Sequence, residues 1–384
     1  MSTPSVRHPG EFRWETRLLA VVTLTLTGFG VANCLAAGAY LEASYHEAIQ
    51  QAGAALAGGL IFLAVAYTDY HIWRRLAKPL LIATLVGLVL IAIPALIWGN
   101  SPAPGVVEAL FPLHGGGRRW IKLGVQVQVS EIARFTLAAY LAAQLAAMGT
   151  KVRHLREGLL PLLGVVGLTM LLIALEPSVS VSVVIAVIGA AIIFTAGARI
   201  SHLMVPAVFG VAVIAAVLVL EPVRAKRLLN YSEPCLEIPP DQACNSLIGF
   251  GSGGVTGTGF GRGNGKLGHM PLIDSDFLLS GVGEEWGLVG VVFVCLCFAI
   301  FCWMGFRIAK TARDPFGTYL ASGLTLGIGV SAFMHAAVVT GLMPVTGLTL
   351  PFMSAGRVSL ILCLFSAGVL VSIGRQRGRP APAR

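Results

Sequence analysis

Runs of apolar residues, each long enough to cross a lipid bilayer, dominate this chain. An α-helix needs roughly 20 mostly apolar residues to span a bilayer core, and about ten such windows occur. They run approximately over Leu18–Leu41, Ala52–Thr68, Leu80–Trp98, Ile132–Met148, Leu159–Leu175, Val179–Ala196, Leu203–Leu220, Phe277–Phe306, Leu320–Thr340 and Val358–Ile373. No alternating strand pattern competes with them, and lipid tolerates only spans whose backbone groups are all paired. The windows therefore predict an all-α polytopic membrane protein.

Composition agrees with this class. Of the 384 residues, 56% are hydrophobic and 12% are charged, which excludes an ordinary soluble domain and a disordered chain. The first window is too long for a removable signal peptide and lacks the small-residue cleavage site, so we count it as a span. We expect one membrane domain over residues 18–374, between a cytoplasmic segment 1–17 and a basic cytoplasmic tail 375–384.

Basic residues gather in alternate connections between the windows, which by the positive-inside rule predicts that both termini are cytoplasmic. Most of the 27 basic residues lie there, namely Arg7, Arg13, Arg17, Arg74, Arg75, Lys78, Lys151, Arg153, Arg156, Arg199, Arg307, Lys310, Arg313, Arg375, Arg377, Arg379 and Arg384. These membrane anchors explain the net charge of +9. With no nucleic-acid motif in the chain, we expect no nucleic acid partner.

Three polar or Gly/Pro-rich segments fall on the opposite face, at about 99–130, 221–275 and 341–357. Long loops in compact proteins usually carry function, so the chemistry is expected to face outside. Cys235 and Cys244 both lie in the second loop, where they either form a disulfide or remain two thiols. No His or second Cys pair with zinc-like spacing lies nearby, so we do not expect a metal site there.

The first exterior loop concentrates cationic and aromatic side chains, Arg118, Arg119, Trp120 and Lys122, directly after three glycines. Guanidinium groups bind phosphate in a bidentate manner, and an indole can stack on a sugar. Trp and Arg also favour membrane boundaries without any ligand. The residues alone leave ligand binding and interfacial anchoring equally open.

Two further patterns have structural interpretations. Glu131 and Arg134 stand three residues apart at the start of a span and are expected to form a structural ion pair on one helix face. Glycine recurs between Gly249 and Gly265 without a preceding strand or a closing phosphate-loop lysine. This segment predicts close packing or a backbone bend rather than nucleotide binding, with direct ligand contact as the weaker alternative.

Four stretches, in order, carry a family resemblance: GGRRWIKLGVQVQVSE, GSGGVTGTGFGRGNGKLGHMP, DSDFLLSGVGEEWGLVG and GLMPVTGLTLPFMSAGRVS. Together with the predicted helices, they resemble the SEDS family of cell-shape, division and sporulation proteins over nearly the whole chain. The resemblance implies a peptidoglycan glycosyltransferase that polymerises lipid II at the outer face of the bacterial cytoplasmic membrane. It also implies a class B penicillin-binding protein as the transpeptidase partner. The glycine-rich stretch is closer to the division-type, FtsW-like pattern than to the elongation-type, RodA-like one.

The resemblance assigns the catalytic carboxylate to Asp276, which directly precedes a span. The sugar hydroxyl of one lipid II attacks the anomeric carbon of the lipid-linked glycan and expels undecaprenyl pyrophosphate with inversion. Because a hydroxyl is a weak nucleophile at neutral pH, a general base contributes typically about 10²–10⁴-fold.

The pyrophosphate leaving group accumulates negative charge in the transition state, which nearby cations stabilise. The resemblance favours Arg118, Arg119 and Arg227 for this role, with Lys266 and Arg357 as further candidates. Lys122 is another candidate cation on the same face, and Trp120 and Ser354 are also expected to bind substrate. No cofactor or metal ligand set is evident, although a divalent ion bridging Asp276 and pyrophosphate is left open. A non-catalytic scaffold for the transpeptidase and a lipid II flippase remain as alternative functions.

This sequence departs from the family pattern at several positions. Asp274 stands where the family commonly has His and is expected to cap the following helix, or else to raise the pKa of Asp276. Glu284 and Glu285 are expected to be buried in the bundle, with a role in a substrate channel as the alternative. The other departures are Ser178, Ser180, His335 and Arg357.

Overall fold

A computed structural model describes residues 13–38, 42–99, 101–114, 117–149, 158–176, 178–199, 242–263 and 273–377, and positions 152, 154, 208, 210, 212 and 235. These residues are almost entirely helical, as the apolar windows predict. The helices are α1 (Arg13–Gly38), α2 (Glu42–Tyr67), α3 (His71–Trp98), α4 (Gly105–Leu110), α5 (Val129–Met148), α6 (Leu160–Leu175), α7 (Val179–Thr195), α10 (Gln242–Gly253), α11 (Leu278–Lys310), α12 (Pro315–Val339) and α13 (Arg357–Arg375).

The protein is a multi-pass membrane protein. Among the described residues, six helices are long and apolar enough to cross a membrane: α1, α2, α3, α11, α12 and α13. Two shorter apolar helices are α6 and the part of α7 from Ser180 to Thr195. The window Leu203–Leu220 lies outside the described residues except for three single positions. A total of ten spans therefore stays a prediction.

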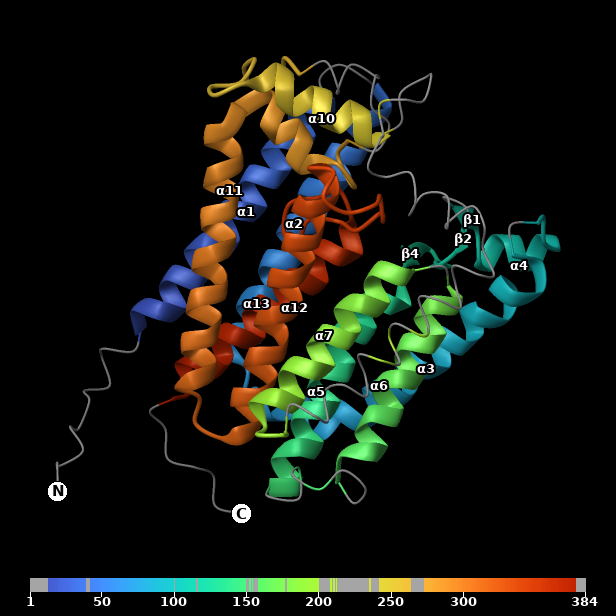
Figure 1. Cartoon of the computed structure of the whole chain (residues 1–384), viewed down its shortest axis with the longest axis vertical. Helices are drawn as coiled ribbons and strands as arrows, with labels where there is room; N and C mark the ends of the chain where they lie inside the picture. Colours follow the sequence, from blue (N-terminus) through green and yellow to red (C-terminus); the bar gives the residue numbers. More distant parts are fainter. Residues whose placement is uncertain are drawn as a thin grey trace.

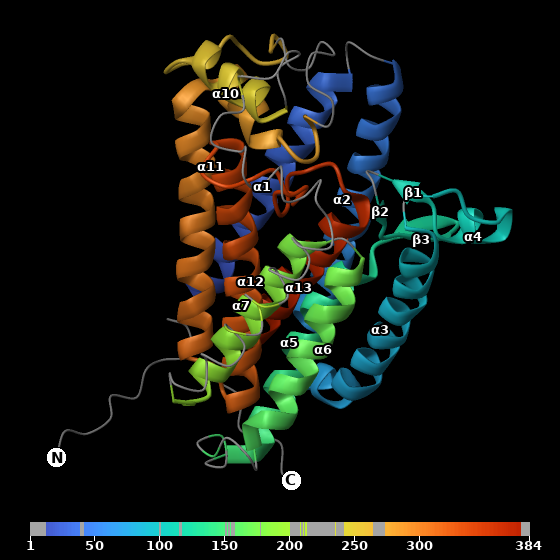
Figure 2. The same ribbon diagram turned by 45° about the vertical axis from the view of Figure 1, so that its right-hand side comes forward.

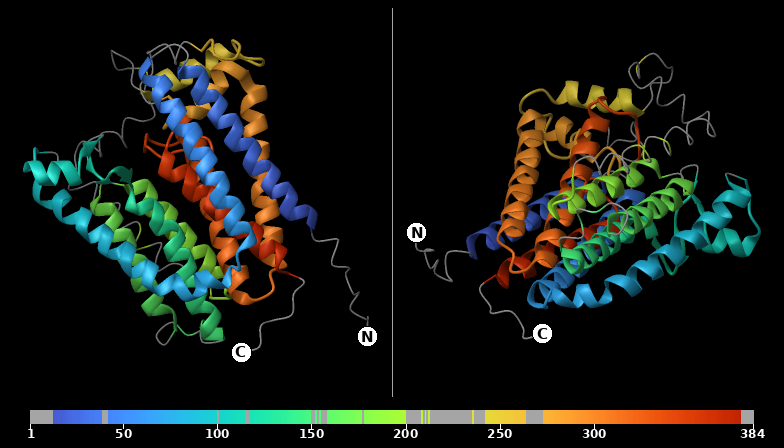
Figure 3. Two further views of the ribbon diagram at one scale, coloured as in Figure 1. Left: turned by 180° about the vertical axis from the view of Figure 1, so that it is seen from behind. Right: turned by 60° about the horizontal axis from the view of Figure 1, so that its bottom comes forward.

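The helices form two groups that meet along α7, α5 and α12. Helices α1, α2, α11, α12 and α13 make one group, and α3, α5, α6 and α7 make the other (Figure 1). From behind, α1 and α2 run side by side along the first group (Figure 3). Helix α10 lies across one end of the molecule, next to the start of α11 (Figure 1).

The start of α1 and the end of α13 lie together at the end opposite α10 (Figure 1). Glu15 of α1 is buried there, and its carboxylate binds Arg307 Nε at 2.8 Å and Arg377 Nη1 at 2.7 Å. The two ends of the membrane domain thus share one side, as an even number of spans requires. Which side of the membrane this is stays a prediction, and the terminal segments 1–17 and 375–384 lie largely outside the described residues.

Two segments predicted as connections are more ordered than expected. The basic link that holds Arg74, Arg75 and Lys78 is helical, because α3 already begins at His71. Long cationic side chains can run along a helix and keep their charges in the interface, so charge alone does not end a membrane helix. Helix α10 likewise forms inside the predicted loop 221–275, most of which lies outside the described residues.

The predicted loop 99–130 contains helix α4 and two small antiparallel ribbons, which the sequence analysis does not predict. Strand β1 (Leu113–His114) pairs with β2 (Gly117–Arg118), and β3 (Ile121–Leu123) pairs with β4 (Val125–Val127). The turn of the second ribbon is Gly124, whose φ of 78° suits glycine. Figure 2 shows α4 and the ribbons beside the end of α3, projecting from the helices.

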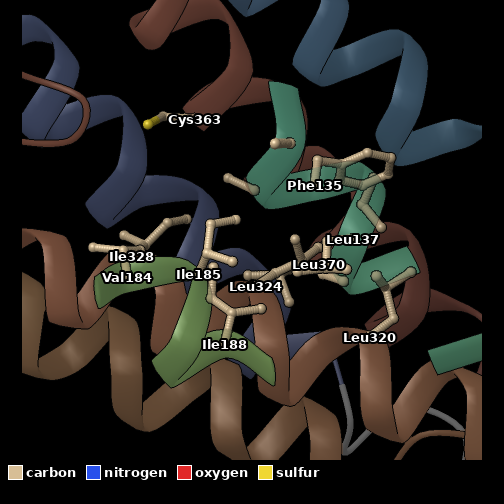
Figure 4. Close-up of a cluster of buried hydrophobic side chains, with 14 of the residues drawn as sticks. Phe135, Leu137, Val184, Ile185, Ile188, Leu320, Leu324, Ile328, Cys363 and Leu370 are labelled. Atoms are coloured by element: carbon tan, nitrogen blue, oxygen red, sulfur yellow. The ribbon is translucent and has the colours of Figure 1, made fainter. Parts of the chain in front are cut away.

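The core where the two groups meet is built from α5, α7, α12 and α13. Figure 4 shows its buried side chains, among them Phe135, Leu137, Val184, Ile185, Ile188, Leu320, Leu324, Ile328 and Leu370. Gly323 and Gly327 of α12 lie so close to Ile192 and Ile188 of α7 that a Cβ at either glycine would overlap the isoleucine. Small residues allow this close approach between membrane helices. The contact fixes the start of α7 next to the loop that follows α12.

A break in α11 explains why its apolar window is unusually long. Gly287 has φ 63° and ψ −161° inside the helix, a conformation that other residues rarely adopt. The glycine-rich segment packs against this break, with Thr258 N donating to Glu284 O at 2.9 Å and Leu288 N to Gly254 O at 2.9 Å. The predicted packing role of the glycine-rich segment is confirmed over residues 249–263.

Candidate active site

Asp276 lies, half-buried, in the turn immediately before α11, whose first turn is bonded to α10 through Ser280 Oγ and Ser246 O. The residue at the cap position of α11 is Phe277, three positions after Asp274, and its side chain makes no capping hydrogen bond. The predicted capping role of Asp274 is therefore wrong, because Asp274 stands too early in the turn. Its backbone carbonyl instead accepts a hydrogen bond from Ala355 N at 2.7 Å.

The loop between α12 and α13 holds the turn of Asp276 in place. Ser354 Oγ donates to Ser275 O at 2.6 Å and accepts from Leu350 N at 2.8 Å. A Cβ placed on Gly347 would lie 3.4 Å from Asp276 Oδ2, so the loop backbone covers one side of the carboxylate. Since the Ser354 hydroxyl is buried and engaged in both bonds, we assign it a positioning role instead of the predicted contact with substrate.

Side chains from two helices, α2 and α12, hydrogen-bond to the backbone of this loop. Gln51 of α2 donates through Nε2 to Ser354 O at 2.8 Å, and its Oε1 accepts from Gly356 N at 3.2 Å. His335 of α12 donates through Nδ1 to Leu348 O at 2.8 Å. In the sequence, His335 stands out as a departure from the family pattern, whereas Gln51 does not stand out, because its partners are more than 300 positions away. Gln51 stands immediately before the predicted apolar window 52–68. This position is the only local sign that its side chain is buried.

The positive charge of Arg119 affects the pKa of two carboxyl groups, those of Asp276 and Glu176. Burial raises the pKa of Asp276 above its ordinary value, while the positive charge of Arg119 and a hydrogen bond from Ser275 lower it. Burial also raises the pKa of Glu176 to about 9, against an opposing effect of the same Arg119. The site therefore contains one guanidinium within electrostatic reach of two carboxyl groups.

Glu176 occupies the turn between α6 and α7 and is completely buried, with 0% of its surface exposed. Within the described part of the chain, neither carboxyl oxygen has a hydrogen-bond partner. The turn approaches the Asp276 loop through Ser180, whose hydroxyl lies 3.5 Å from Thr346 O. Glu176 is not among the predicted site residues, although a lone acid between two apolar helices is a sequence signal of function.

Arg118 faces away from this site. Its guanidinium donates to Phe111 O at 2.6 Å and Ser101 O at 2.9 Å, and it pairs with Glu108 Oε2 at 2.8 Å. The side chain is 1% exposed and ties helix α4 to the first ribbon. Neighbouring side chains on extended backbone point to opposite sides, which separates Arg118 from Arg119. We therefore assign Arg118 a structural role instead of the predicted phosphate contact.

The predicted ion pair at the start of α5 is confirmed. Arg134 Nη2 lies 2.9 Å from Glu131 Oε1, and both side chains are largely buried. Ser359 of α13 adds a contact of 3.4 Å to the other oxygen of Glu131. The pair thus joins α5 to α13 beneath the loop that holds Asp276.

The remaining predicted residues are placed with less detail. Trp120 is half-buried, and Lys122 is exposed on β3, so their roles in substrate binding stay predictions. Arg227 and Lys266 lie outside the described residues. Glu284 and Glu285 are buried at the start of α11, as expected.

Cys235 and Cys244, for which the sequence leaves a disulfide and two thiols equally open, form a disulfide. Cys244 is buried in α10, so the bond ties position 235 to this helix. Across the residues that the structure describes, no group of three or more His, Cys, Asp or Glu side chains could hold a metal ion. Whether the reaction uses a divalent ion stays untested.

Comparison with known proteins gives matches over nearly the whole chain. The family model FtsW/RodA/SpoVE, described as "Cell cycle protein", matches residues 16–379. The "Probable peptidoglycan glycosyltransferase FtsW" of Geobacter sulfurreducens is 31% identical over 373 residues, which are 94% of this chain and 96% of the relative. "Stage V sporulation protein E" of Bacillus subtilis is 32% identical over 367 residues, with 93% and 96% covered.

Solved structures share the fold. A chain from a structure described as "Structural coordination of polymerization and crosslinking by a peptidoglycan synthase complex" has a TM-score of 0.72 and 25% identity, covering 94% of this chain and 98% of its own. The rod shape determining protein RodA of Thermus thermophilus has a TM-score of 0.66 and 23% identity, covering 94% and 97%. The second likeness supports the arrangement of the helices alone.

Proposed function

This chain belongs to the FtsW/RodA/SpoVE family of cell cycle proteins, and from that membership we propose that it polymerises lipid II with Asp276 as the general base. It is a peptidoglycan glycosyltransferase, the activity for which its FtsW relatives are named. Within the family it is FtsW-like, in agreement with the division-type pattern of its glycine-rich stretch.

The position of Asp276 is the observation that carries this proposal. Its carboxyl group is half-buried beside Gly347, on a turn fixed by the Ser354–Ser275 hydrogen bond. A general base works best when its pKa lies near the working pH, and burial moves the pKa of Asp276 in that direction. The carboxylate takes the proton of the attacking sugar hydroxyl while the new glycosidic bond forms and the bond to pyrophosphate breaks.

Arg119 is the best-placed cation for the leaving group. Negative charge accumulates on the departing pyrophosphate, and a fixed guanidinium stabilises such charge most strongly in a site with little water. Arg119 already acts on the carboxyl group of Asp276, whereas Arg118 is committed to Glu108 and two carbonyls. The transferred sugar therefore lies between a base and a cation that are near each other.

The proposed setting is the bacterial cytoplasmic membrane, with ten spans, cytoplasmic termini and the Asp276 site facing outward. Basic residues at the end opposite α10 support this orientation. The partner is a class B penicillin-binding protein that crosslinks the new strands. Its support is the structural relative of 25% identity, which is described as part of a complex that coordinates polymerisation and crosslinking.

The decisive experiment is lipid II polymerisation by the purified protein with its transpeptidase partner. Asp276→Asn should lower the rate by about 10²-fold or more, since it removes the base and leaves the shape unchanged. Asp274→Asn is the matched control, because it neutralises a carboxylate two positions away, and it should retain most of the activity. Thermal unfolding of each variant checks the fold.

Other outcomes would favour the alternative functions. If neither native protein nor variants make glycan while partner binding is intact, the scaffold function replaces the polymerase. If the Asp276→Asn variant moves lipid II across liposome membranes and native protein makes no glycan, the protein is a flippase. Equal polymerisation by native protein and Asp276→Asn would remove Asp276 from the role of base.

A further inference from the structure

A glutamine on α2 holds the backbone segment that lies next to the turn of the catalytic acid. Gln51 is 2% exposed, and both ends of its amide are bonded to residues 354–356, here called the bridging segment. Its Nε2 donates to Ser354 O at 2.8 Å, and its Oε1 accepts from Gly356 N at 3.2 Å. Only one orientation of the amide pairs a donor with an acceptor at both positions, so this side chain fixes the bridging segment against α2.

The bridging segment is also bonded to the turn that carries the base. Ser354 Oγ donates to Ser275 O at 2.6 Å, and Ala355 N donates to Asp274 O at 2.7 Å. These two acceptors are the backbone carbonyls of the residues directly before Asp276. A shift of the bridging segment would therefore strain or break two hydrogen bonds beside the base and move its carboxylate.

The backbone just before the bridging segment is strained. Phe352 has φ 65°, and it is the one non-glycine residue with a positive φ among the described residues. Such a conformation persists only where the surroundings hold it in place. The Phe352 ring packs against Phe298 and Phe301 of α11, and a Cβ on Gly30 of α1 would overlap the backbone of Met353. The loop is thus held from α1 and α11, and the amide from α2 adds two hydrogen bonds.

We propose that Gln51 is a positioning residue for the general base: it holds the bridging segment against α2, so that the hydrogen bonds of this segment keep Asp276 in its productive place. The proposal rests on the proposed function, since it takes Asp276 as the base. Gln51 acts through backbone atoms and exchanges no proton with the substrate. A misplacement of about 1 Å can cost roughly 10²-fold in rate, so even a small shift of the turn is expected to slow the reaction.

The test replaces Gln51 with methionine, which is similar in size and can make neither hydrogen bond. Gln51→Met should lower kcat for lipid II polymerisation by about tenfold or more and leave KM within about threefold, because a misplaced base slows the chemical step without removing a contact to the substrate. Gln50→Met is the matched control on α2 and should keep the native kcat, because the Gln50 amide bonds to His46 one turn earlier. Gln51→Glu keeps the length of the side chain and an acceptor for Gly356 N, so it should recover part of the loss.

Two double variants separate positioning from a general loss of structure. In the Asp276→Asn background, Gln51→Met should change the residual rate by less than about twofold, because no base remains to be misplaced. Combined with Ser354→Ala, Gln51→Met should cost much less than the product of the two single losses, because both changes release the same turn. A further loss of about tenfold in the Asp276→Asn background would show that Gln51 acts on something other than the base, against the proposal.

Hydrogen exchange distinguishes failure of this proposal from failure of the proposed function. Gln51→Met should speed exchange of the Ala355 and Gly356 amides by about fivefold or more, whether or not the protein makes glycan. A folded Gln51→Met variant with native exchange at these amides, or with native kcat, overturns the proposal. Faster exchange, together with equal polymerisation by native protein and Asp276→Asn, would instead place the failure in the proposed function. Thermal unfolding checks each variant, and Gln51→Glu carries the same measurements if Gln51→Met does not fold.

Discussion

Replacing Gly347 with alanine tests whether the loop after α12 controls access to the carboxylate of Asp276. Gly347 has φ 65°, and the added Cβ would lie 3.4 Å from Asp276 Oδ2. Two effects follow. A left-handed backbone costs a residue with a side chain roughly 1–2 kcal/mol, and the new methyl group occupies the space beside one carboxylate oxygen.

Gly341→Ala is a matched control in the same loop. Gly341 has φ 74°, so its backbone cost is similar, but its Cβ would meet only the two methyl groups of Leu247, at 3.7 and 3.8 Å. Both variants should therefore unfold more easily by about 1–2 kcal/mol. Only Gly347→Ala should also reduce polymerisation, because its methyl group blocks approach to the base.

The expected loss for Gly347→Ala is at least about tenfold in kcat, part of the 10²–10⁴-fold that a general base contributes. The other carboxylate oxygen of Asp276 keeps some of its function, so the loss should be smaller than in Asp276→Asn. The assay is lipid II polymerisation per folded molecule, together with thermal unfolding of both variants. Equal activity of Gly347→Ala and Gly341→Ala would refute the idea that the acceptor sugar approaches Asp276 beside Gly347.

Three more predictions concern the supports of the site. Glu131→Gln should destabilise the protein by about 3 kcal/mol in denaturant unfolding, because Arg134 is left buried and unpaired, and an effect below about 1 kcal/mol would contradict this. Cys235→Ser should add one thiol that alkylates in the denatured, unreduced protein, at Cys244, and lower stability by about 2–3 kcal/mol, and a native protein whose Cys235 and Cys244 both alkylate under those conditions would disprove the bond. His335→Ala should leave a buried carbonyl unpaired at a cost of about 1–3 kcal/mol and should lower kcat more than it raises KM, while His335→Asn, which keeps a donor, should recover part of the loss.

The membrane class and most helices were predictable because burial in lipid imposes a simple composition rule. Helix starts were harder, as α12 illustrates. Its window was predicted from Leu320, yet the helix begins at Pro315, where Asp314 accepts a hydrogen bond from Gly317 N. Asp followed by Pro is a helix-start signal that an apolar window does not register. The start of α3 was missed for the opposite reason, because its first turns are basic and still helical.

The roles of site residues were predictable only where they depend on neighbours in the sequence. The Glu131–Arg134 pair follows from spacing on one helix, and its prediction is confirmed. Arg118 and Arg119 are adjacent and chemically identical, so the sequence could not tell which one would tie α4 to the ribbon. Gln51 acquires its role only through folding, because its partners come from the far end of the chain.

Arg119 also links the base to the leaving group in the proposed reaction. Burial raises the pKa of Asp276, and the positive charge of Arg119 lowers it by a smaller amount. The same fixed charge would stabilise the pyrophosphate as negative charge builds there. Arg119→Gln should therefore lower the polymerisation rate and also shift the rising limb of the pH–rate profile to higher pH, because Asp276 then loses its proton less readily. A lower rate with an unshifted limb would show that Arg119 acts on the leaving group and not on the base.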